Sequence, residues 1–91
     1  MESDTIAALS TPLGKGGIAV IRISGDRVPD ILAEIIEPLP GKIVPRQAYH
    51  SFVKDKEHQR RIDECVVVFY QAPHSYTGED AAEISIHSNP F

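Results

Sequence analysis

The apolar run Cys65-Val66-Val67-Val68-Phe69-Tyr70 constrains the fold of this chain more than any other feature. β-branched and aromatic residues favour extended backbone, so residues 62–70 are predicted to form a strand. Apolar and polar residues do not alternate within the run. This pattern is typical of a strand that is covered on both faces.

Four further segments are predicted to be extended: residues 5–9, 17–24, 48–54 and 82–87. One apolar stripe has helical spacing, and it consists of Val28, Ile31, Leu32 and Ile35. Pro29 is tolerated in the first turn of a helix, and Pro38 ends the pattern. The order of elements predicts an α+β domain with a small mixed β-sheet and one or two helices.

The length of 91 residues is enough for one domain. The acidic start, Met1-Glu2-Ser3-Asp4, is unlike a signal peptide, and no apolar run approaches the ~18 residues of a membrane span. The single cysteine, Cys65, excludes an internal disulfide and is typical of a reducing compartment. We therefore expect a cytoplasmic protein without membrane contact, in which Cys65 is an inert core residue.

The net charge of −4 argues against a domain that holds nucleic acid by itself. Binding to phosphates needs several cations that converge on one surface. One basic cluster is present, and acidic residues interrupt and follow it: Lys54, Lys56, Arg60 and Arg61. We interpret this cluster as the solvated tip of a hairpin.

The spacing of several residues excludes nucleotide, catalytic and metal motifs. Gly14-Lys15-Gly16 lacks the earlier glycine and the following Ser or Thr of a P-loop, so this chain alone is not expected to bind GTP. Glu83, Ser85 and His87 alternate along one expected strand, which places them side by side rather than in nucleophile–base geometry. The four histidines have no metal-binding spacing. No catalytic residue and no metal ligand is therefore predicted.

The most distinctive motif is Ser75-Tyr76-Thr77-Gly78-Glu79-Asp80, which precedes a strand-like run. Gly78 permits a sharp turn, and two adjacent carboxylates follow it. Loops at the ends of strands commonly carry functional residues. Taken alone, however, this hexapeptide fits a solvated turn better than a binding site.

Three segments near the start of the chain accompany the hexapeptide: DTIAA at 4–8, TPLGKGG at 11–17 and IAVIRISG at 18–25. In this order the four segments resemble the N-terminal domain of the MnmE (TrmE) family of tRNA-modification GTPases, over essentially all 91 residues. One departure is His87-Ser88-Asn89-Pro90, where the family usually has a His-Gly-Gly-Pro-like sequence. Because the two glycines are missing, the backbone conformation that the family has at that turn cannot be assumed for this chain.

The resemblance implies a fold similar to the tetrahydrofolate-binding domain of the glycine-cleavage T-protein. It also implies two roles, namely binding of a reduced folate of the 5-formyltetrahydrofolate type and formation of a homodimer. The complete protein would be a hydrolase that uses GTP, magnesium and potassium and, together with MnmG (GidA), modifies the wobble uridine of tRNA.

Within such a protein, residues 1–91 would be an N-terminal folate-binding and dimerisation domain that is incomplete at its C-terminal end. The helical and GTPase domains would be absent from it, so this chain alone is not expected to be an enzyme. A sheet without its full cover would favour self-association.

By position in the family motifs, the resemblance implies a folate site lined by Arg22, Tyr76, Thr77, Gly78 and Glu79. A pterin presents a guanidine-like edge that an ionised carboxylate accepts, and the candidate acids are Glu79, Asp80 and Glu83. The aromatic residues Tyr76 and Phe69 could border the ring.

Strand alternation places Arg22 on the face of its expected strand that also carries Ile18 and Val20. Both faces of this strand are apolar, so we expect the guanidinium to lie near a buried surface and to need an anionic partner. That partner is either an internal carboxylate or a carboxylate of the ligand, which Lys15 could also contact. The internal candidates are Glu79, Asp80 and Glu83.

Two alternatives compete with this interpretation. The chain could be a fragment of a folate-dependent aminomethyltransferase of the T-protein type, although the GKGG-to-RISG segment at its start argues against this. It could also be a ligand-free dimerisation module, which a folate titration would distinguish from a folate-binding domain.

Overall fold

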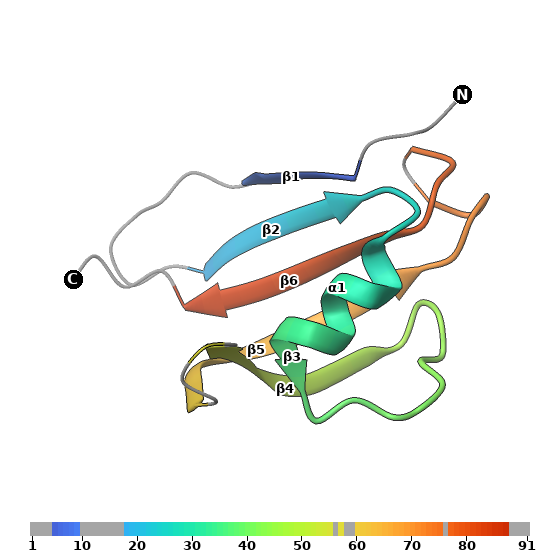
Figure 1. The fold of residues 1–91 in the computed structure, drawn as a ribbon. Coiled ribbons are helices and arrows are strands. Elements are labelled where there is room, and N and C mark those ends of the chain that lie inside the picture. Colours follow the sequence, from blue (N-terminus) through green and yellow to red (C-terminus); the bar gives the residue numbers. More distant parts are fainter. Residues whose placement is uncertain (1–4, 10–17, 56, 58–59, 76, 88–91) are drawn as a thin grey trace.

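The computed structural model describes residues 5–9, 18–55, 57, 60–75 and 77–87, which form a six-stranded sheet with one helix against it (Figure 1). Across the sheet the strands lie in the order β1-β2-β6-β5-β4-β3. Their bounds are β1 Ile6–Leu9, β2 Ile18–Ser24, β3 Ile36–Glu37, β4 Ala48–Asp55, β5 Arg60–Tyr70 and β6 Ala81–His87. The predicted α+β class is confirmed. Where a mixed sheet was expected, each pairing between the described strands is antiparallel.

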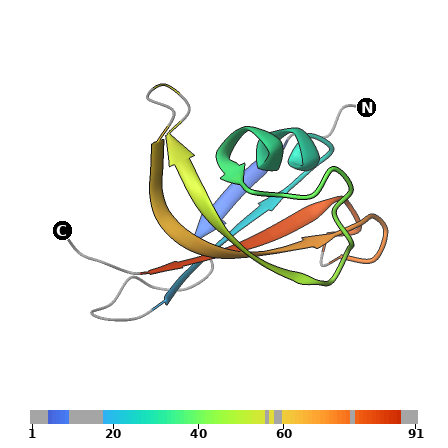
Figure 2. The ribbon, with the colours of Figure 1, turned by 90° about the horizontal axis from the view of Figure 1, so that it is seen from below.

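The helix α1 spans Val28–Ile35 and lies across one face of the sheet (Figures 1 and 2). Pro29 occupies its first turn, where a backbone N–H has no helical partner, and Asp30 lies near the positive end of the helix dipole. Leu32, a member of the predicted apolar stripe, is 0% exposed. At Ile36 the backbone becomes extended, with φ −120° and ψ 130°, so α1 passes directly into β3.

The core lies between α1 and the face of the sheet that α1 covers, which we call the inner face. Its buried side chains from the three central strands are Ile23, Cys65, Val67, Phe69, Ala82 and Ile84. Successive residues of a strand point to opposite faces, so the residues between them form the outer face. Val66 on β5 is 39% exposed there. The prediction that both faces of β5 are covered is therefore wrong for the described residues.

The turn that follows β2 ties three strands together. Gly25 has φ 142°, a conformation that L residues with a side chain rarely adopt, and its N–H donates to the carbonyl oxygen of Asp80 at 2.9 Å. A Cβ atom on Gly25 would lie 2.7 Å from the Cβ of Thr5. Because Thr5 precedes β1 and Asp80 precedes β6, this turn fixes the ends of β1, β2 and β6 against one another.

The β4–β5 hairpin bends toward the side of the sheet that carries α1 (Figure 2). Two members of the basic cluster lie against Glu37 of β3, with Lys54 Nζ at 3.3 Å and Arg61 Nε at 3.7 Å from its carboxylate. The guanidinium of Arg61 also lies 4.3 Å from the ring centre of Phe52. These two cations therefore form contacts within the fold, while Lys56 lies outside the described residues. Within the described ranges, no helix is long and apolar enough to cross a membrane.

Candidate functional site

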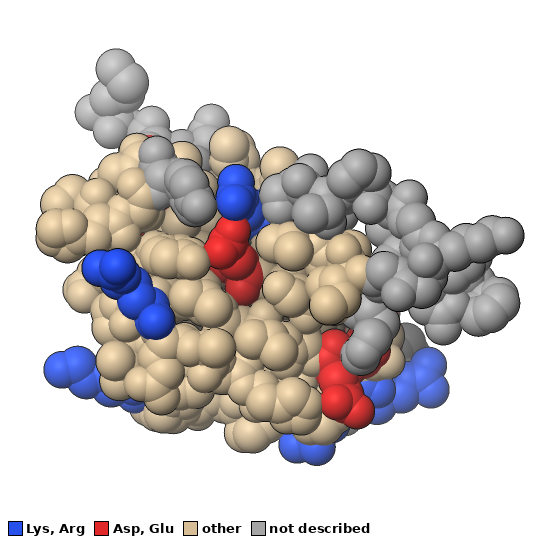
Figure 3. All heavy atoms as spheres, turned by 180° about the vertical axis from the view of Figure 1, so that it is seen from behind, with Lys and Arg blue, Asp and Glu red and all other residues tan. Residues whose placement is uncertain are grey.

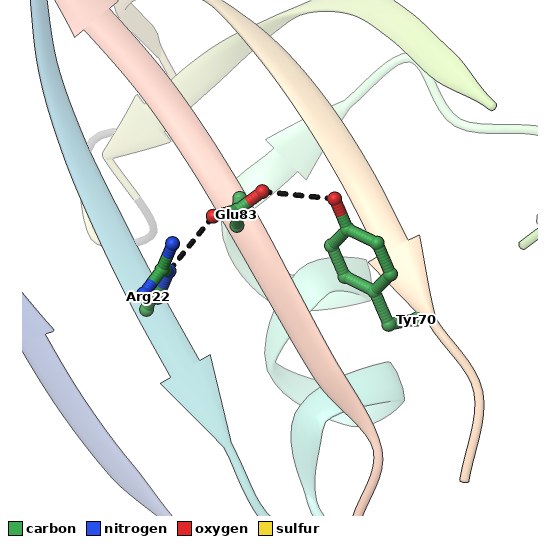
Figure 4. A network of polar contacts seen from close by, with 3 residues as sticks. All are labelled: Arg22, Tyr70 and Glu83. Atoms are coloured by element: carbon green, nitrogen blue, oxygen red, sulfur yellow. Dashed lines mark hydrogen bonds and ion pairs between the residues drawn. The ribbon is translucent and has the colours of Figure 1, made fainter. Parts of the chain in front are cut away.

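Three polar side chains meet on the outer face of the sheet, each from a different strand (Figure 4). The Nε–H of Arg22 on β2 donates to Oε2 of Glu83 on β6 at 2.7 Å. The hydroxyl of Tyr70, the last residue of β5, donates to Oε1 of Glu83 at 2.9 Å. We call these three residues the Arg22–Glu83–Tyr70 network.

The pairing of the strands explains why these residues meet. Arg22 and Glu83 are direct partners across the β2–β6 ladder, where opposite Cβ atoms are separated by roughly 4.5–5.5 Å. Tyr70 is the partner of Ala81, which precedes Glu83 by two residues and therefore lies on the same face of β6. A long aromatic side chain reaches such a diagonal neighbour.

The network keeps Glu83 ionised. The hydrogen bond from Arg22 lowers the pKa of Glu83, burial acts in the opposite direction, and the hydrogen bond from Tyr70 lowers the pKa further. The Glu83 side chain retains 21% of its exposure, and that of Arg22 retains 44%. Each carboxylate oxygen has more than one acceptor site, so Glu83 can accept further hydrogen bonds from a ligand.

A hollow of about 190 Å³ lies beside the network and has mainly apolar walls. Its lining residues are Ile6, Ala8, Arg22, Ile23, Ser24, Tyr70, Thr77, Ala81, Ala82 and Glu83. Figure 3 looks onto the face opposite α1, which is largely uncharged and has one acidic group in contact with one basic group near its middle. The hollow therefore combines apolar walls with a few polar groups that converge on it, as small-molecule sites usually do.

Among the described residues of the hexapeptide, Thr77 lines this hollow. The Thr77 hydroxyl lies 2.6 Å from the hydroxyl of Ser24, the last residue of β2, and this contact ties the loop to the sheet. Gly78 has φ 79°, so it adopts the left-handed conformation that a glycine permits in a sharp turn. Glu79 acts through its backbone, because its N–H donates to Thr77 Oγ1 at 3.3 Å and its carbonyl accepts from the Ser75 hydroxyl.

Two other predicted contacts of the ligand have structural roles instead. Oδ1 of Asp80 accepts the backbone N–H of Ala72 at 2.9 Å, which fixes the loop between β5 and β6. Phe69 is 8% exposed and belongs to the core on the inner face, so it does not border the outer hollow. Among the described residues, the aromatic ring that lines this hollow is that of its neighbour Tyr70.

The environment of Arg22 differs from the expectation in one respect. A guanidinium near a buried surface was predicted, yet the outer face of β2 has no cover in the described structure and the side chain is 44% exposed. Its internal partner is Glu83, one of the three acids considered from the sequence. Tyr76 and Lys15, two other residues considered for the ligand, lie outside the described residues.

Sequence reasoning did not identify Tyr70 as a site residue. Alternation along β5 places it on the outer face, but the order of strands decides that Glu83 is its neighbour. A polar aromatic residue at the end of an otherwise apolar strand was the one available signal, since a Tyr hydroxyl usually finds a partner.

A larger hollow of about 810 Å³ lies between α1 and residues 38–43. Both Asp80 and Phe69 contribute to its lining, but each already has the structural role described above. The larger hollow also has charged lining residues, namely Glu37, Lys42 and Asp80. The smaller hollow is the candidate site because it brings together Arg22, Thr77 and Glu83, three of the residues considered from the sequence.

Cys65 and the histidines offer no second site in the described part of the chain. Cys65 is 3% exposed, and burial together with the nearby charge of Asp63 raises the pKa of its thiol to about 11, as befits the predicted core residue. No group of three or more His, Cys, Asp or Glu side chains among the described residues is arranged to hold a metal ion.

Comparison with known proteins identifies relatives over almost the whole chain. The family model described as the GTP-binding protein TrmE N-terminus matches residues 5–91. The tRNA modification GTPase MnmE of Pseudothermotoga lettingae is 48% identical over 84 residues, which cover 92% of this chain and 18% of that protein. The protein of the same name from Thermotoga maritima is 46% identical over 88 residues, covering 97% and 19%.

A third relative, the tRNA modification GTPase MnmE of Roseiflexus castenholzii, is 44% identical over 92 residues and covers 100% of this chain and 20% of its own length. The chain thus spans about a fifth of the length of the curated relatives it matches. With a family model matched from residue 5 to residue 91 and identities above 40%, the chain belongs to the TrmE (MnmE) family and corresponds to the N-terminal domain of its members.

Proposed function

We propose that this chain is the N-terminal domain of a tRNA-modification GTPase and that the hollow beside the Arg22–Glu83–Tyr70 network binds a reduced folate. The names of the relatives support the first part of the proposal. Hydrolysis of GTP with magnesium and potassium, and modification of the wobble uridine of tRNA together with MnmG, belong to the part of the protein beyond this domain. The domain itself binds and performs no catalysis, and we place the protein in the cytoplasm.

The observation that carries the folate proposal is the ionised carboxylate of Glu83 at the wall of a mainly apolar hollow. A pterin ring has two flat faces and a guanidine-like edge, and such an edge donates a pair of parallel hydrogen bonds to a carboxylate. In the proposed complex Glu83 accepts these bonds while Arg22 keeps it ionised. The apolar side chains of Ile6 and Ala81 cover the ring, and Tyr70 flanks it.

The size of the hollow limits what it can hold. A volume of about 190 Å³ is below the roughly 300–1,000 Å³ of sites that enclose a drug-sized ligand. The hollow is therefore suited to the bicyclic ring of the folate, and the remainder of the ligand extends beyond it. When bound, the folate supplies the one-carbon unit, and the residues of this domain bind and orient its ring.

Calorimetric titration with 5-formyltetrahydrofolate tests this proposal. Glu83→Gln preserves the shape of the side chain but removes its charge, so we expect affinity to fall by about 10-fold or more, because hydrogen bonds to ionised groups contribute roughly 1.5–3 kcal/mol. The matched control is Glu64→Gln, since Glu64 is also exposed and lies next to His50 without lining the hollow. Equal affinity of the parent and Glu83→Gln, or no binding to the parent, would contradict the proposal.

We also propose that the domain forms a homodimer through its outer face. Three large apolar side chains on this face are strongly exposed, with Ile6 at 63%, Ile18 at 63% and Val66 at 39%. Ile18 and Val66 also line one shallow hollow together, and exposed apolar surface of this kind commonly marks an interface. Because the face is also largely uncharged, a second copy could approach it without burying many unpaired charges (Figure 3).

Sedimentation of the parent and two variants tests dimerisation. We expect the parent to sediment above the 10.0 kDa of a single chain, and Val66→Glu to sediment as a monomer. Val44→Glu is the control, because Val44 is 51% exposed but lies in the connector between β3 and β4. A parent that sediments as a monomer at micromolar concentration would refute the dimer, and a dimer without folate binding would identify a ligand-free dimerisation module.

A further inference from the structure

A second hollow adjoins the candidate site and shares one residue with it. Its volume is about 410 Å³, and it is lined by Arg46, Tyr70, Pro73, His74 and Ser75. Tyr70 also lines the smaller hollow, where its hydroxyl donates to Glu83. The two hollows therefore adjoin each other at Tyr70.

The backbone of Arg46 fixes where this second hollow lies in the sheet. The N–H of Arg46 donates to the carbonyl oxygen of Phe69 at 2.7 Å, so Arg46 lies beside the end of β5, just before β4 begins. Three neighbouring strands thus carry, in order across the sheet, Arg22 on β2, Glu83 on β6 and Tyr70 on β5. Arg46 follows on the other side of β5, just before β4 begins. Neighbouring strands are separated by about 4.8 Å, so these three steps span about 14 Å.

The second hollow has a cationic wall whose backbone is held in place. Arg46 has φ 64°, which is uncommon for a residue with a side chain, and its hydrogen bond to Phe69 holds it there. Among the described residues, no carboxylate forms an ion pair with Arg46. Across the hollow, the backbone N–H of His74 donates to the carbonyl of Gln71 at 2.9 Å.

We propose that this second hollow binds the carboxylates of the glutamate tail of the folate whose ring occupies the first hollow. The inference rests on the proposed function and names a further part of the ligand. A folate carries its anionic carboxylates at the end opposite the pterin ring, with an aromatic ring between them. Arg46 presents a planar fork of donors that suits a carboxylate, and Tyr70 lines both hollows, where it can flank the central ring.

The charge of the chain strengthens this assignment. The net charge of −4 works against the approach of any anionic ligand, so a ligand with two or more carboxylates needs a local cation. Among the described lining residues, Arg46 supplies the guanidinium of the second hollow, three strand positions across the sheet from Arg22. The site is therefore expected to prefer folates that carry glutamate over pterins that lack it.

Two ligands and four variants test the inference. 5-Formyltetrahydrofolate has the ring and the tail, whereas 6-methyltetrahydropterin has the ring alone. We expect Arg46→Gln to weaken binding of the folate by about 10-fold and to leave binding of the pterin unchanged, because a charge-assisted hydrogen bond is removed only from the tail. Arg46→Lys keeps the charge without the fork and should recover part of the lost affinity.

The matched control is Arg60→Gln, because Arg60 is an exposed arginine at the opposite end of β5 and lines neither hollow. It should change neither affinity, and melting curves verify that each variant is folded. The folate advantage should also shrink as salt is raised, since salt screens exposed charges.

The outcomes separate the inference from the function on which it rests. If Glu83→Gln weakens both ligands but Arg46→Gln binds the folate as tightly as the parent, the tail assignment is wrong and the ring site stands. Equal weakening of both ligands by Arg46→Gln would also overturn the tail assignment, because Arg46 would then act on the ring. If the parent binds neither ligand, the proposed function and this inference both fail.

Discussion

Replacing Glu83 with Gln should lower the free energy of unfolding only modestly, but it should weaken ligand binding strongly. The size of the loss in stability follows from how exposed the partners of Glu83 are. Glu83 receives hydrogen bonds from Arg22 at 2.7 Å and from Tyr70 at 2.9 Å. A fully buried ion pair that loses one partner costs about 3–5 kcal/mol. Arg22 is 44% exposed and regains water when its partner loses charge, so the appropriate scale is that of exposed pairs, about 0.2–1 kcal/mol.

The hydrogen bond from Tyr70 adds to this value only in part, because the amide oxygen of Gln can still accept from one of the two donors. We therefore expect the free energy of unfolding of Glu83→Gln to fall by about 1 kcal/mol. For a domain of this size that corresponds to a decrease in Tm of about 4–8 °C. Glu64→Gln lies outside the network and should lower Tm less than Glu83→Gln, because its contact with His50 at 3.0 Å joins two side chains that are each more than half exposed.

The pH dependence of this difference gives an independent check. The pKa of Glu83 is lowered from its ordinary value of 4.5, so the folded state binds its proton less tightly than the unfolded state does. The stability contributed by the charge is thus fully present above the unfolded pKa, and it is lost as pH falls through the folded pKa. The parent and Glu83→Gln should differ at neutral pH and should converge on acidification.

Thermal melting and urea titration at neutral pH and at a series of pH values that falls well below 4.5 measure both effects. A double-mutant cycle with Arg22→Ala isolates the pair, and we expect a coupling of about 0.5–1 kcal/mol between Arg22 and Glu83. An unchanged Tm at neutral pH would refute the network as a stabilising contact. A loss that persists undiminished at acidic pH would show that packing, rather than charge, is responsible.

Three further predictions concern the core and the turn that follows β2. Leu32→Ala should lower the free energy of unfolding by about 2–5 kcal/mol in urea titrations, because Leu32 is 0% exposed; a loss below about 1 kcal/mol would contradict its place in the core. Gly25→Ala should reduce Tm, since the new Cβ would meet Thr5 at a residue with φ 142°, whereas Gly41→Ala should not, because nothing lies within 4 Å of its Cβ position. Cys65 should react with a maleimide at neutral pH only as fast as the domain opens, since its thiol is buried and its pKa is raised to about 11; labelling as fast as a free thiol would refute its burial.

The elements with strong local signals were predicted correctly from the sequence. The β-branched residues of β2 and the apolar run of β5 favour extended backbone wherever they are placed, and α1 follows from the spacing of Val28 and Leu32. The strand β3 was not predicted because two residues show no alternation, and its pairing with β4 depends on where α1 ends. The prediction that both faces of β5 are covered was wrong. An apolar composition indicates that a face can be buried, but it does not indicate which segment of the chain packs against that face.

The candidate site was only partly predictable for a related reason. Arg22 and Glu83 are 61 residues apart in the sequence, and they meet because β6 is inserted beside β2 in the sheet. Alternation gives the face on which each side chain lies, but it does not give the neighbouring strand. Hence the sequence identified Arg22, Thr77 and three candidate acids, whereas the choice of Glu83 and the role of Tyr70 required the strand order.

Mapping of chemical shifts by heteronuclear NMR tests the location of the folate site most directly. When 5-formyltetrahydrofolate is added, the side-chain Nε–H of Arg22 and the backbone amides of Thr77 and residues 81–83 should show the largest changes, because they surround the outer hollow. The amides of Leu39, Gly41, Lys42 and Ile43, which line the larger hollow next to α1, should change little. Largest changes at residues 38–43, or none at Arg22 and residues 81–83, would contradict a folate site at the Arg22–Glu83–Tyr70 network.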